Sequence, residues 1–409
     1  MLVVERHQIK RNHSSFKEID HLAFLSKNLF NSIIYLLRQE WFEYLKFKKE
    51  NKTLKFKFVT YKEIAKNWAA CNHPDYRALP AKVSQHVLKQ AFQTFKSFIV
   101  LLKAGEKARP PRYKDKLKGR NLLIYTAQAI SSKQNMRGIK LSCTNIFAPV
   151  QTKNKIHQIR IVPGKHFYTL EIVYERYCKK KRTNINVAAI DLGVNNLATV
   201  TFNNDSPIIV PGTPLKSINQ FYNKRKGALQ SQLHKGQYWS HKLSSLTVKR
   251  NNKISDYLHK ASRYIINYLV SHNISTLVIG RNLEWKQRIN LGNKTNQNFV
   301  SIPFYKFIGM LQYKAALSGI SIIEQEESYT SKCSFLDKEN VSQHKVYAGK
   351  RIMRGLFKTR AGKLINADCN GSANIMKKAI PNVIFTNGIE AVVVQLRRVK
   401  ASERNNWSI

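Results

Sequence analysis

The sequence predicts an α/β protein built of several domains. Strand and helix patterns alternate from residue 187 to residue 327, and this alternation requires an α/β sheet. Apolar residues recur at helical spacing through much of residues 14–106, and short runs of β-forming residues follow up to residue 177. The 409 residues, of which 43% are hydrophobic, suffice for two or three domains that each bury a core.

The N-terminal part is predicted to be mostly helical after a short strand at residues 1–9. Apolar positions with a helical period indicate one helix over residues 15–49 and a second over residues 60–70. A turn is expected at residues 73–75, where a proline follows a histidine. The apolar stripe of residues 83–99 is typical of a helix that packs in the core of a bundle.

The pattern then changes to short β runs, which predict a small β-barrel or sandwich. Residues 1–9 are expected to supply its first strand, with the helices inserted between that strand and the rest. The β runs are residues 121–125, 138–141, 157–162 and 168–174.

The C-terminal half begins with an unbroken apolar run that ends at Asp191. Gly193 and the Asn195–Asn196 pair allow a tight reversal into a second β run, so a hairpin is expected here. The elements expected after it are helices at residues 216–236, 254–272 and 304–318 and strands at residues 275–280 and 319–327.

The charge of the chain requires a polyanionic partner. The 70 Lys and Arg residues against 24 Asp and Glu give a net charge of +46, which would be self-repulsive without such a partner. Because the basic residues extend from Lys10 to Arg404, a long nucleic acid is expected. A membrane surface is disfavoured, because no apolar run reaches about 18 residues. Five scattered cysteines fit a reducing cytosol.

One segment, residues 109–120, concentrates six positive charges around a tyrosine. Two prolines exclude a helix, so the segment is either a solvated linker or an arm along a phosphate backbone. The charge of the whole chain favours nucleic-acid contact. The expected contact residues are Arg109, Arg112, Tyr113, Lys114, Lys116, Lys118 and Arg120.

Two carboxylates stand where regular structure begins or ends. Asp191 ends a buried strand, at the edge where α/β sheets place their chemistry. Asp368 stands just ahead of a helix predicted to run to about Ala379. Either residue alone is explained by a turn or a helix cap. Together, in a polycationic protein, they indicate phosphodiester hydrolysis, in which clustered carboxylates hold two Mg²⁺ ions about 4 Å apart.

At these residues the sequence resembles the OrfB/TnpB proteins of small insertion sequences. The resemblance covers nearly the whole chain, and its blocks occur in the family's order. They are AIDLGVNNLAT at residues 189–199, Tyr313-Lys314, Tyr329-Thr330-Ser331 and DCNGSANI at residues 368–375.

The resemblance implies a fold and a function. The fold is an RNase H-like RuvC nuclease domain plus an N-terminal β-barrel wedge with an inserted α-helical recognition lobe. The function is an RNA-guided DNA endonuclease that cuts beside a short adjacent motif, promotes retention of its transposon and is related to type V CRISPR effectors. Its partners would be a transposon-derived guide RNA and double-stranded DNA. Its cofactor would be two Mg²⁺ or Mn²⁺ ions. It would act in the cytoplasm of a prokaryotic cell, associated with the nucleoid.

On this reading the chain divides into four parts. They are the wedge at residues 1–13 and 107–180, the recognition lobe at 14–106, the RuvC domain at 181–380 with a degenerate zinc-ribbon insertion at about 329–364, and a basic tail at 381–409.

By the same resemblance, Asp191 and Asp368 are the first and third RuvC carboxylates, but the second is missing from its usual position. Gly280 stands there, and glycine has no side chain to bind a metal. Three replacements are open. Glu326 and Glu327 end the neighbouring strand and are preferred to Glu284, because strand ends hold geometry better than an Asn-rich loop. Asp191, Asp368 and Glu327 are the expected metal ligands.

The family's zinc ribbon is also incomplete. Of its two CxxC pairs only Cys333 remains, and one thiol cannot make a four-ligand site, so no zinc is expected. A lone histidine, His344, does not replace the missing ligands. Apolar residues are expected to take the metal's structural role: Phe335, Leu336, Tyr347, Leu356 and Phe357. Nearby cations, Lys350, Arg351 and Arg354, are expected to line a nucleic-acid groove.

Two other functions remain open. A chain that has lost its second carboxylate would be an inactive RNA-guided DNA-binding protein, acting as a repressor or an accessory transposition factor. An unguided basic RNA-binding protein would leave the Asp191–Asp368 pair without a role.

Overall fold

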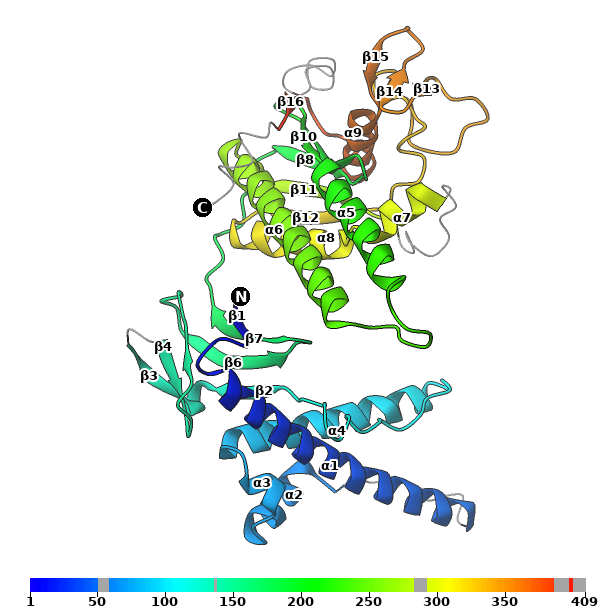
Figure 1. The fold of residues 1–409 in the computed structure, drawn as a ribbon. Helices are drawn as coiled ribbons and strands as arrows, with labels where there is room; N and C mark the ends of the chain where they lie inside the picture. The colour runs from blue at the N-terminus through cyan, green and yellow to red at the C-terminus, as the bar shows by residue number, and fades with distance from the viewer. Residues whose placement is uncertain (51–58, 136–137, 283–292, 386–396, 400–409) are drawn as a thin grey trace. The chain divides into compact units, whose positions relative to one another are not determined.

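The computed structural model describes residues 1–50, 59–135, 138–282, 293–385 and 397–399 (Figure 1). Contacts within the chain divide it into two compact units, Met1–Arg176 and Tyr177–Ile409. Across the described ranges, no helix has both the length and the apolar character needed to cross a bilayer.

The helices of the first unit follow the predicted periodicity. Helix α1 (Phe16–Glu50) packs against α4 (Ala81–Lys103), and both bury their apolar stripes in one core. Thr60 caps α2 (Tyr61–Ala70) through a reciprocal hydrogen-bonded box with Glu63. The turn expected at residues 73–75 is instead the start of a one-turn helix, α3 (Pro74–Arg77), because proline is well suited to the first helical position.

The strands of the first unit form two separate sheets. The four-stranded sheet has the order β1-β7-β6-β2, and residues 2–10 of β1 pair antiparallel with residues 167–175 of β7. All four helices lie in the sequence between β1 and β2, and whether the two sheets form a barrel wedge stays a prediction. The bounds are β1 Leu2–Lys10, β2 Leu123–Thr126, β6 Ile156–Pro163 and β7 Phe167–Glu175, with β3 Ile130–Asn135, β4 Gly138–Leu141 and β5 Phe147–Ala148 in the second sheet.

A six-stranded sheet of order β12-β11-β8-β9-β10-β16 forms the centre of the second unit. Strand β8 pairs antiparallel with β9, as the predicted hairpin requires, and parallel with β11, which in turn pairs parallel with β12. The bounds are β8 Val187–Asp191, β9 Asn196–Phe202, β10 Ile208–Pro211, β11 Thr276–Gly280, β12 Ser321–Gln325 and β16 Arg397–Arg398.

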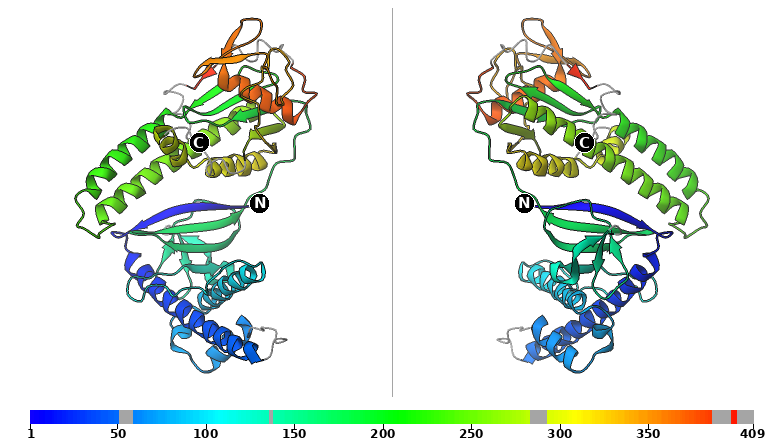
Figure 2. Two further views of the ribbon diagram at one scale, coloured as in Figure 1. Left: turned by 90° about the vertical axis from the view of Figure 1, so that its right-hand side faces the viewer. Right: turned by 90° about the vertical axis from the view of Figure 1, so that its left-hand side faces the viewer.

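Helices cover both faces of this sheet (Figures 1 and 2). Ala188 and Ile190 of β8 pack with α6 and α8, whereas Val187 and Ala189 pack with α9. Because side chains alternate along a strand, Asp191 belongs to the α9 face. The helices are α5 Thr213–Gln230, α6 His241–Ser271, α7 Asn293–Ser301, α8 Phe304–Leu317 and α9 Ala367–Ala379.

Three features of the second unit differ from the sequence prediction. Helix α6 begins thirteen residues earlier than expected, at a Ser240 cap, because its first turns carry polar residues without an apolar stripe. Strand β12 ends at Gln325 rather than at residue 327. Arg397 and Arg398, placed in a basic tail by the sequence, pair with β10 as β16. A small sheet of β13 (Lys350–Met353), β14 (Leu356–Lys358) and β15 (Leu364–Asn366) precedes α9.

A buried lysine joins α6 to α8. Lys314 is 3% exposed, and its Nζ donates to the carbonyl oxygen of His259 and to Oγ of Ser262, both at 2.7 Å. Burial, with a smaller contribution from Arg263, lowers the pKa of Lys314 to about 7. The folded protein therefore pays for a buried charge below about pH 7, and this cost falls as the pH rises toward the ordinary lysine pKa of about 10.4.

We expect Lys314→Met to remove this pH dependence. Between pH 7 and 10 the unfolded chain holds the lysine proton more tightly than the folded chain, so this group makes wild type gain stability with rising pH. The melting temperature of the variant, relative to that of wild type, should therefore be higher at pH 6 than at pH 9. A difference that is equal at the two pH values would contradict the assignment.

Candidate active site

The first carboxylate is placed by the β8–β9 hairpin. Asp191 is the last residue of β8 and lies on the face of the sheet that α9 covers. Asn196, the first residue of β9, donates from Nδ2 to Oδ2 of Asp368 at 2.7 Å. The hairpin thus carries one carboxylate and orients another, and the second role of Asn196 was not foreseen from the sequence.

Asp368, the expected third carboxylate, lies on α9. Asp368 is in the first turn of this helix rather than ahead of it, because Asn366 is the cap and accepts from the backbone NH groups of Asp368 and Cys369. A carboxylate in the first turn is favoured by the helix dipole. This first turn therefore presents Asp368 beside the hairpin.

The rest of the DCNGSANI block fixes α9 to its surroundings. A Cβ added at Gly371 would lie 2.9 Å from Oδ2 of Asp191, so the glycine lets the helix approach that carboxylate. Ser372 donates to the carbonyl oxygen of Ala189 in β8 at 2.8 Å. These contacts explain why small residues follow Asp368 in the motif.

Two asparagines one helical turn apart hold the chain that follows Glu327. Asn370 and Asn374 are fully buried, and both donate from Nδ2 to the carbonyl oxygen of Cys333. Asn374 also donates to the carbonyl oxygen of Thr330. The motif that carries Asp368 therefore also fixes residues 330–333, and with them the end of the segment on which Glu327 lies.

Glu327 occupies the space in front of Gly280. A Cβ added at Gly280 would lie 2.3 Å from Oε1 of Glu327, a separation that real atoms do not adopt. Asn282 holds the glutamate: its Oδ1 accepts from the backbone NH of Glu327 at 3.1 Å, and its Nδ2 donates to Oε2 at 3.4 Å. The missing side chain at residue 280 is thus matched by a glutamate two residues beyond the end of the adjacent strand.

The electrostatics of the three carboxylates favour a cation between them. Burial and the charges of Glu327 and Asp368 raise the pKa of Asp191 well above its ordinary value. Burial, and to a lesser degree Glu326, raises the pKa of Glu327 to about 7. Oε1 of Glu327 is buried without a hydrogen-bond partner among the described residues. An unpaired buried carboxylate oxygen is costly, and a metal ion would satisfy it.

The donor set fits Mg²⁺, which prefers carboxylate oxygens. Among the residues that the structure describes, no three His, Cys, Asp or Glu side chains are gathered closely enough to be a preformed metal site. The nearest cation is Arg351, whose guanidinium lies 3.4 Å from Oδ1 of Asp368.

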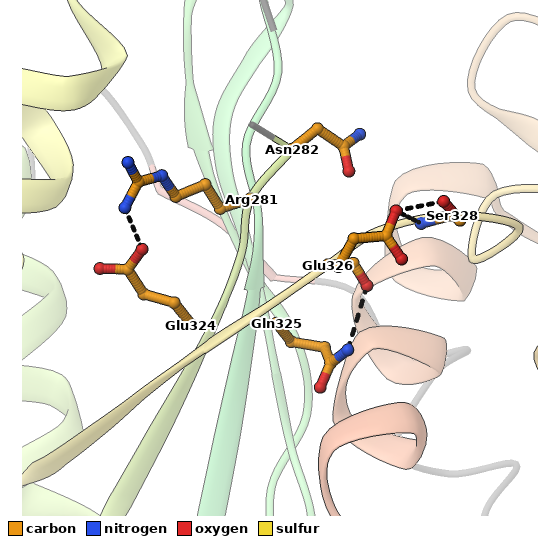
Figure 3. Close-up of a pocket in the computed structure, with 6 residues that line it drawn as sticks. All are labelled: Arg281, Asn282, Glu324, Gln325, Glu326 and Ser328. Atoms are coloured by element: carbon orange, nitrogen blue, oxygen red, sulfur yellow. Dashed lines mark hydrogen bonds and ion pairs between the residues drawn. The ribbon is translucent and has the colours of Figure 1, made fainter. Parts of the chain in front are cut away.

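Glu326, another of the candidate glutamates, does not join this group. Glu326 accepts from Lys378 at 2.7 Å and from Ser328, and its side chain is 54% exposed. Figure 3 shows it in a hollow at the ends of β11 and β12, where Arg281 pairs with Glu324. Partial burial would raise the pKa of Glu326, but its hydrogen bonds lower it. Glu284 lies outside the described residues.

Two protein families match the chain. The OrfB_IS605 family, described as a probable transposase, matches residues 167–286, and the Cas12f1-like TNB domain matches residues 304–375. The TnpB-like protein ORF457 of Acidianus two-tailed virus is 23% identical over 90% of this chain and 84% of its own length. These matches support a relationship of the chain to the OrfB/TnpB proteins and the type V effectors.

Type V effectors are also similar to this TnpB-like chain. The CRISPR-associated endodeoxyribonuclease Cas12f2 of a Micrarchaeota archaeon is 27% identical over 54% of this chain, which covers 41% of that protein. The solved Cas12f1–sgRNA–target DNA complex aligns with a TM-score of 0.55 at 14% identity, over 88% of this chain and 83% of that one. This likeness supports the mixed α/β fold of several domains with a RuvC-like part.

A basic hollow opens beside Asp368 in the TnpB-like second unit. It has a volume of about 610 Å³ and is lined by the hairpin residues 193–196, by Arg351 and Arg354, and by Arg398 of β16. Lys350 is exposed on the same strand as Arg351. The structure thus brings Arg351 and Arg354 to one site, and it adds Arg398, which was not among the predicted nucleic-acid contacts.

The basic segment 109–120 lies along α1 rather than projecting as an arm. Asn31 forms two hydrogen bonds with the backbone of Lys114, and Lys27 donates to the carbonyl oxygen of Lys116. Arg120 forms a two-bond ion pair with Asp20. Arg120 and Lys114 are therefore partly structural residues. The side chains that remain exposed are Arg109, Arg112, Tyr113, Lys116 and Lys118.

Residues 329–364 of the TnpB-like chain are held by carboxylates and an apolar cluster. Glu339 accepts from the backbone NH groups of Ser334 and Ala348, and Asp337 accepts from that of Arg360. Buried Cys333 donates to the carbonyl oxygen of Ser342.

Of the residues expected to replace the metal, two are buried and one packs beside them. Phe335 and Phe357 lie in one cluster, with Leu336 against it. Tyr347 instead contacts the ring of His344, and Leu356 is half-buried. The absence of zinc itself stays a prediction.

Proposed function

We propose that this chain is an RNA-guided, Mg²⁺-dependent DNA endonuclease of the TnpB type. The observation that carries the proposal is that Glu327 and Asp368 lie near enough to Asp191 to raise its pKa, with Glu327 in the space in front of Gly280. Burial and two neighbouring carboxylates disfavour the charged form of Asp191, and Arg351 offsets this only in part. The three carboxylates are the donor set that phosphodiester hydrolysis needs.

Each carboxylate has a defined part in the proposal. Asp191, Asp368 and Glu327 would hold two Mg²⁺ or Mn²⁺ ions, which when bound activate water and stabilise the leaving oxygen. Asn196 orients Asp368, and Asn282 orients Glu327. Packing of α9 against β8 keeps bulk water from the buried side of Asp191.

The cationic surfaces would bind the nucleic acids. Arg351, Arg354 and Arg398 line the hollow beside Asp368, where a DNA phosphate would lie next to the carboxylates. The exposed cations of residues 109–118 and the net charge of +46 supply further phosphate contacts for a guide RNA and duplex DNA.

The remaining parts of the proposal follow the family. The helices of the first unit would be the recognition lobe and its sheets the wedge that reads a short motif beside the target. Cutting near the parent transposon would promote its retention, in the nucleoid of a prokaryotic cell.

The test is cleavage of a plasmid with a randomised flank by protein purified with its co-expressed RNA. We expect cutting in Mg²⁺, none in EDTA, and a loss of more than about a hundredfold in Asp191→Ala, which exceeds the loss that removing an outer-shell partner of a metal causes. Asp256→Ala is the matched control, because Asp256 is 63% exposed on α6 and should leave cutting unchanged.

Two results would change the conclusion. RNA-dependent DNA binding without cutting in any metal would overturn the nuclease and favour a guided repressor. Cutting that does not need the RNA would overturn the guided mechanism.

A further inference from the structure

A ring-lined hollow lies in the first unit, between α1, the α2–α3 turn and the basic segment. Its volume is about 610 Å³, and four of its lining residues carry aromatic rings: Tyr35, Trp68, His73 and Tyr113. Asn31 and Ser32 give it a polar wall, and Lys114 and Lys116 border it. A hollow that combines rings, polar groups and cations is typical of a ligand site.

The rings are arranged as a stacking platform. Trp68 and His73 stack with their centroids 3.9 Å apart and their planes 6° from parallel. Tyr35 and Tyr113 are 58% and 45% exposed, which is unusual for large rings that border the same hollow. Nδ1 of His73 is buried and has no hydrogen-bond partner among the described residues. The site therefore offers the exposed rings of Tyr35 and Tyr113 beside a stacked ring pair.

The floor of the hollow is fixed before any ligand arrives. The two hydrogen bonds between Asn31 and the backbone of Lys114, at 3.0 and 2.9 Å, hold the basic segment on α1. The Arg38 guanidinium lies 5.1 Å from the centre of the Tyr113 ring and donates to the carbonyl oxygen of Pro111. Such preorganisation lowers the entropy cost of binding.

We propose that this hollow binds one unpaired nucleobase of a nucleic-acid strand, with the adjacent phosphates on Lys114 and Lys116. Stacking on rings with cations alongside is how proteins hold single strands, and a base within a duplex is already stacked and cannot enter. The inference needs the proposed function only in so far as the chain must bind nucleic acid. It does not depend on cleavage or on the carboxylates.

The test compares oligonucleotides that carry bases, with ribose or deoxyribose, with a strand that carries none. Binding of fluorescent ten-nucleotide rU, dT and abasic strands is measured by anisotropy at one fixed salt concentration. We expect wild type to bind rU or dT more tightly than the abasic strand. Tyr35→Ala and Tyr113→Ala should each lower the affinity for the preferred strand about tenfold and leave the affinity for the abasic strand unchanged. A preference for rU would assign the site to RNA, and one for dT to DNA.

The control variant is Tyr238→Ala, which removes an 87% exposed tyrosine of the second unit. It should bind all three strands as wild type does. Equal binding of based and abasic strands by wild type would overturn the stacking site, as would a loss in Tyr35→Ala that is the same for both. If the base-dependent affinities were as expected but the protein did not cut DNA, the proposed nuclease would be wrong and the base-binding site would stand.

Discussion

Replacing Glu327 by Gln is expected to reduce DNA cleavage by more than about a hundredfold, whereas Glu326→Gln should leave it within a few fold of wild type. Gln keeps the shape of the side chain but removes the negative charge that would hold a metal. A direct ligand should cost more than the ten- to hundredfold loss seen for outer-shell partners. The measurement is the single-turnover rate of plasmid cutting in Mg²⁺, with protein and co-purified RNA in excess.

Glu326 is a strict control for Glu327, because the two glutamates are adjacent in the sequence. Glu326 is exposed and already paired with Lys378, so its loss removes no metal ligand. Asn282→Ala should fall between the two variants, because it frees Glu327 without removing its charge. If Glu284→Gln rather than Glu327→Gln abolished cutting, the carboxylate would have moved to the loop and the assignment to Glu327 would be wrong.

The parallel pairing of β11 with β12 explains why the sequence could favour Glu326 and Glu327 over Glu284. Gln325 is the register partner of Gly280. Two residues further, Glu327 lies in the space that a side chain at residue 280 would fill, whereas Glu326 pairs with Lys378. The pattern of one strand and its expected neighbour was therefore enough to prefer Glu326 and Glu327 to Glu284, but the register that separates these two comes from the structure. The same reasoning placed Asp191 at a strand end, because an unbroken apolar run has to finish at an edge.

Other parts of the site depend on contacts between residues far apart in the chain. Asn196 and Asp368 are 172 positions apart, and Asn282 and Glu327 are 45 apart, so no local pattern connects them. The one signal available was the pair Asn370 and Asn374, which lie four residues apart in an apolar helix. Buried amides at such a spacing need partners, and here they bind the backbone of residues 330–333.

The basic segment shows a different limit of sequence reasoning. Composition located the charges but could not tell exposed cations from those that hold the fold. Lys114 and Arg120 are as basic as their neighbours, yet one lies over the Phe30 ring and the other pairs with Asp20. The acidic and aromatic partners are on α1, more than 80 residues earlier, so only the packing of that helix reveals them.

Moving the carboxylate back to position 280 is expected to restore activity to a chain that lacks Glu327. Gly280→Ala alone should reduce cutting by at least about tenfold, because its Cβ would meet Oε1 of Glu327 at 2.3 Å and force the glutamate away. Glu327→Ala should be inactive for want of a ligand. Gly280→Glu combined with Glu327→Ala should recover cutting, because the new side chain starts on the same face of the adjacent strand. The single-turnover rates of all the variants are compared in Mg²⁺.

The design also has to remove a second clash, with Ile375 of α9. A Cβ at residue 280 also meets Cδ1 of Ile375 at 2.6 Å, so the transplant and its inactive reference both carry Ile375→Val, which removes that methyl group. Gly309→Ala is the matched glycine control: nothing lies within 4 Å of its new Cβ on α8, and cutting should not change. Recovery in the transplant would show that positions 280 and 327 serve one site, since two independent changes would add their losses. A transplant that folds, binds its RNA and stays as inactive as its reference would contradict that conclusion.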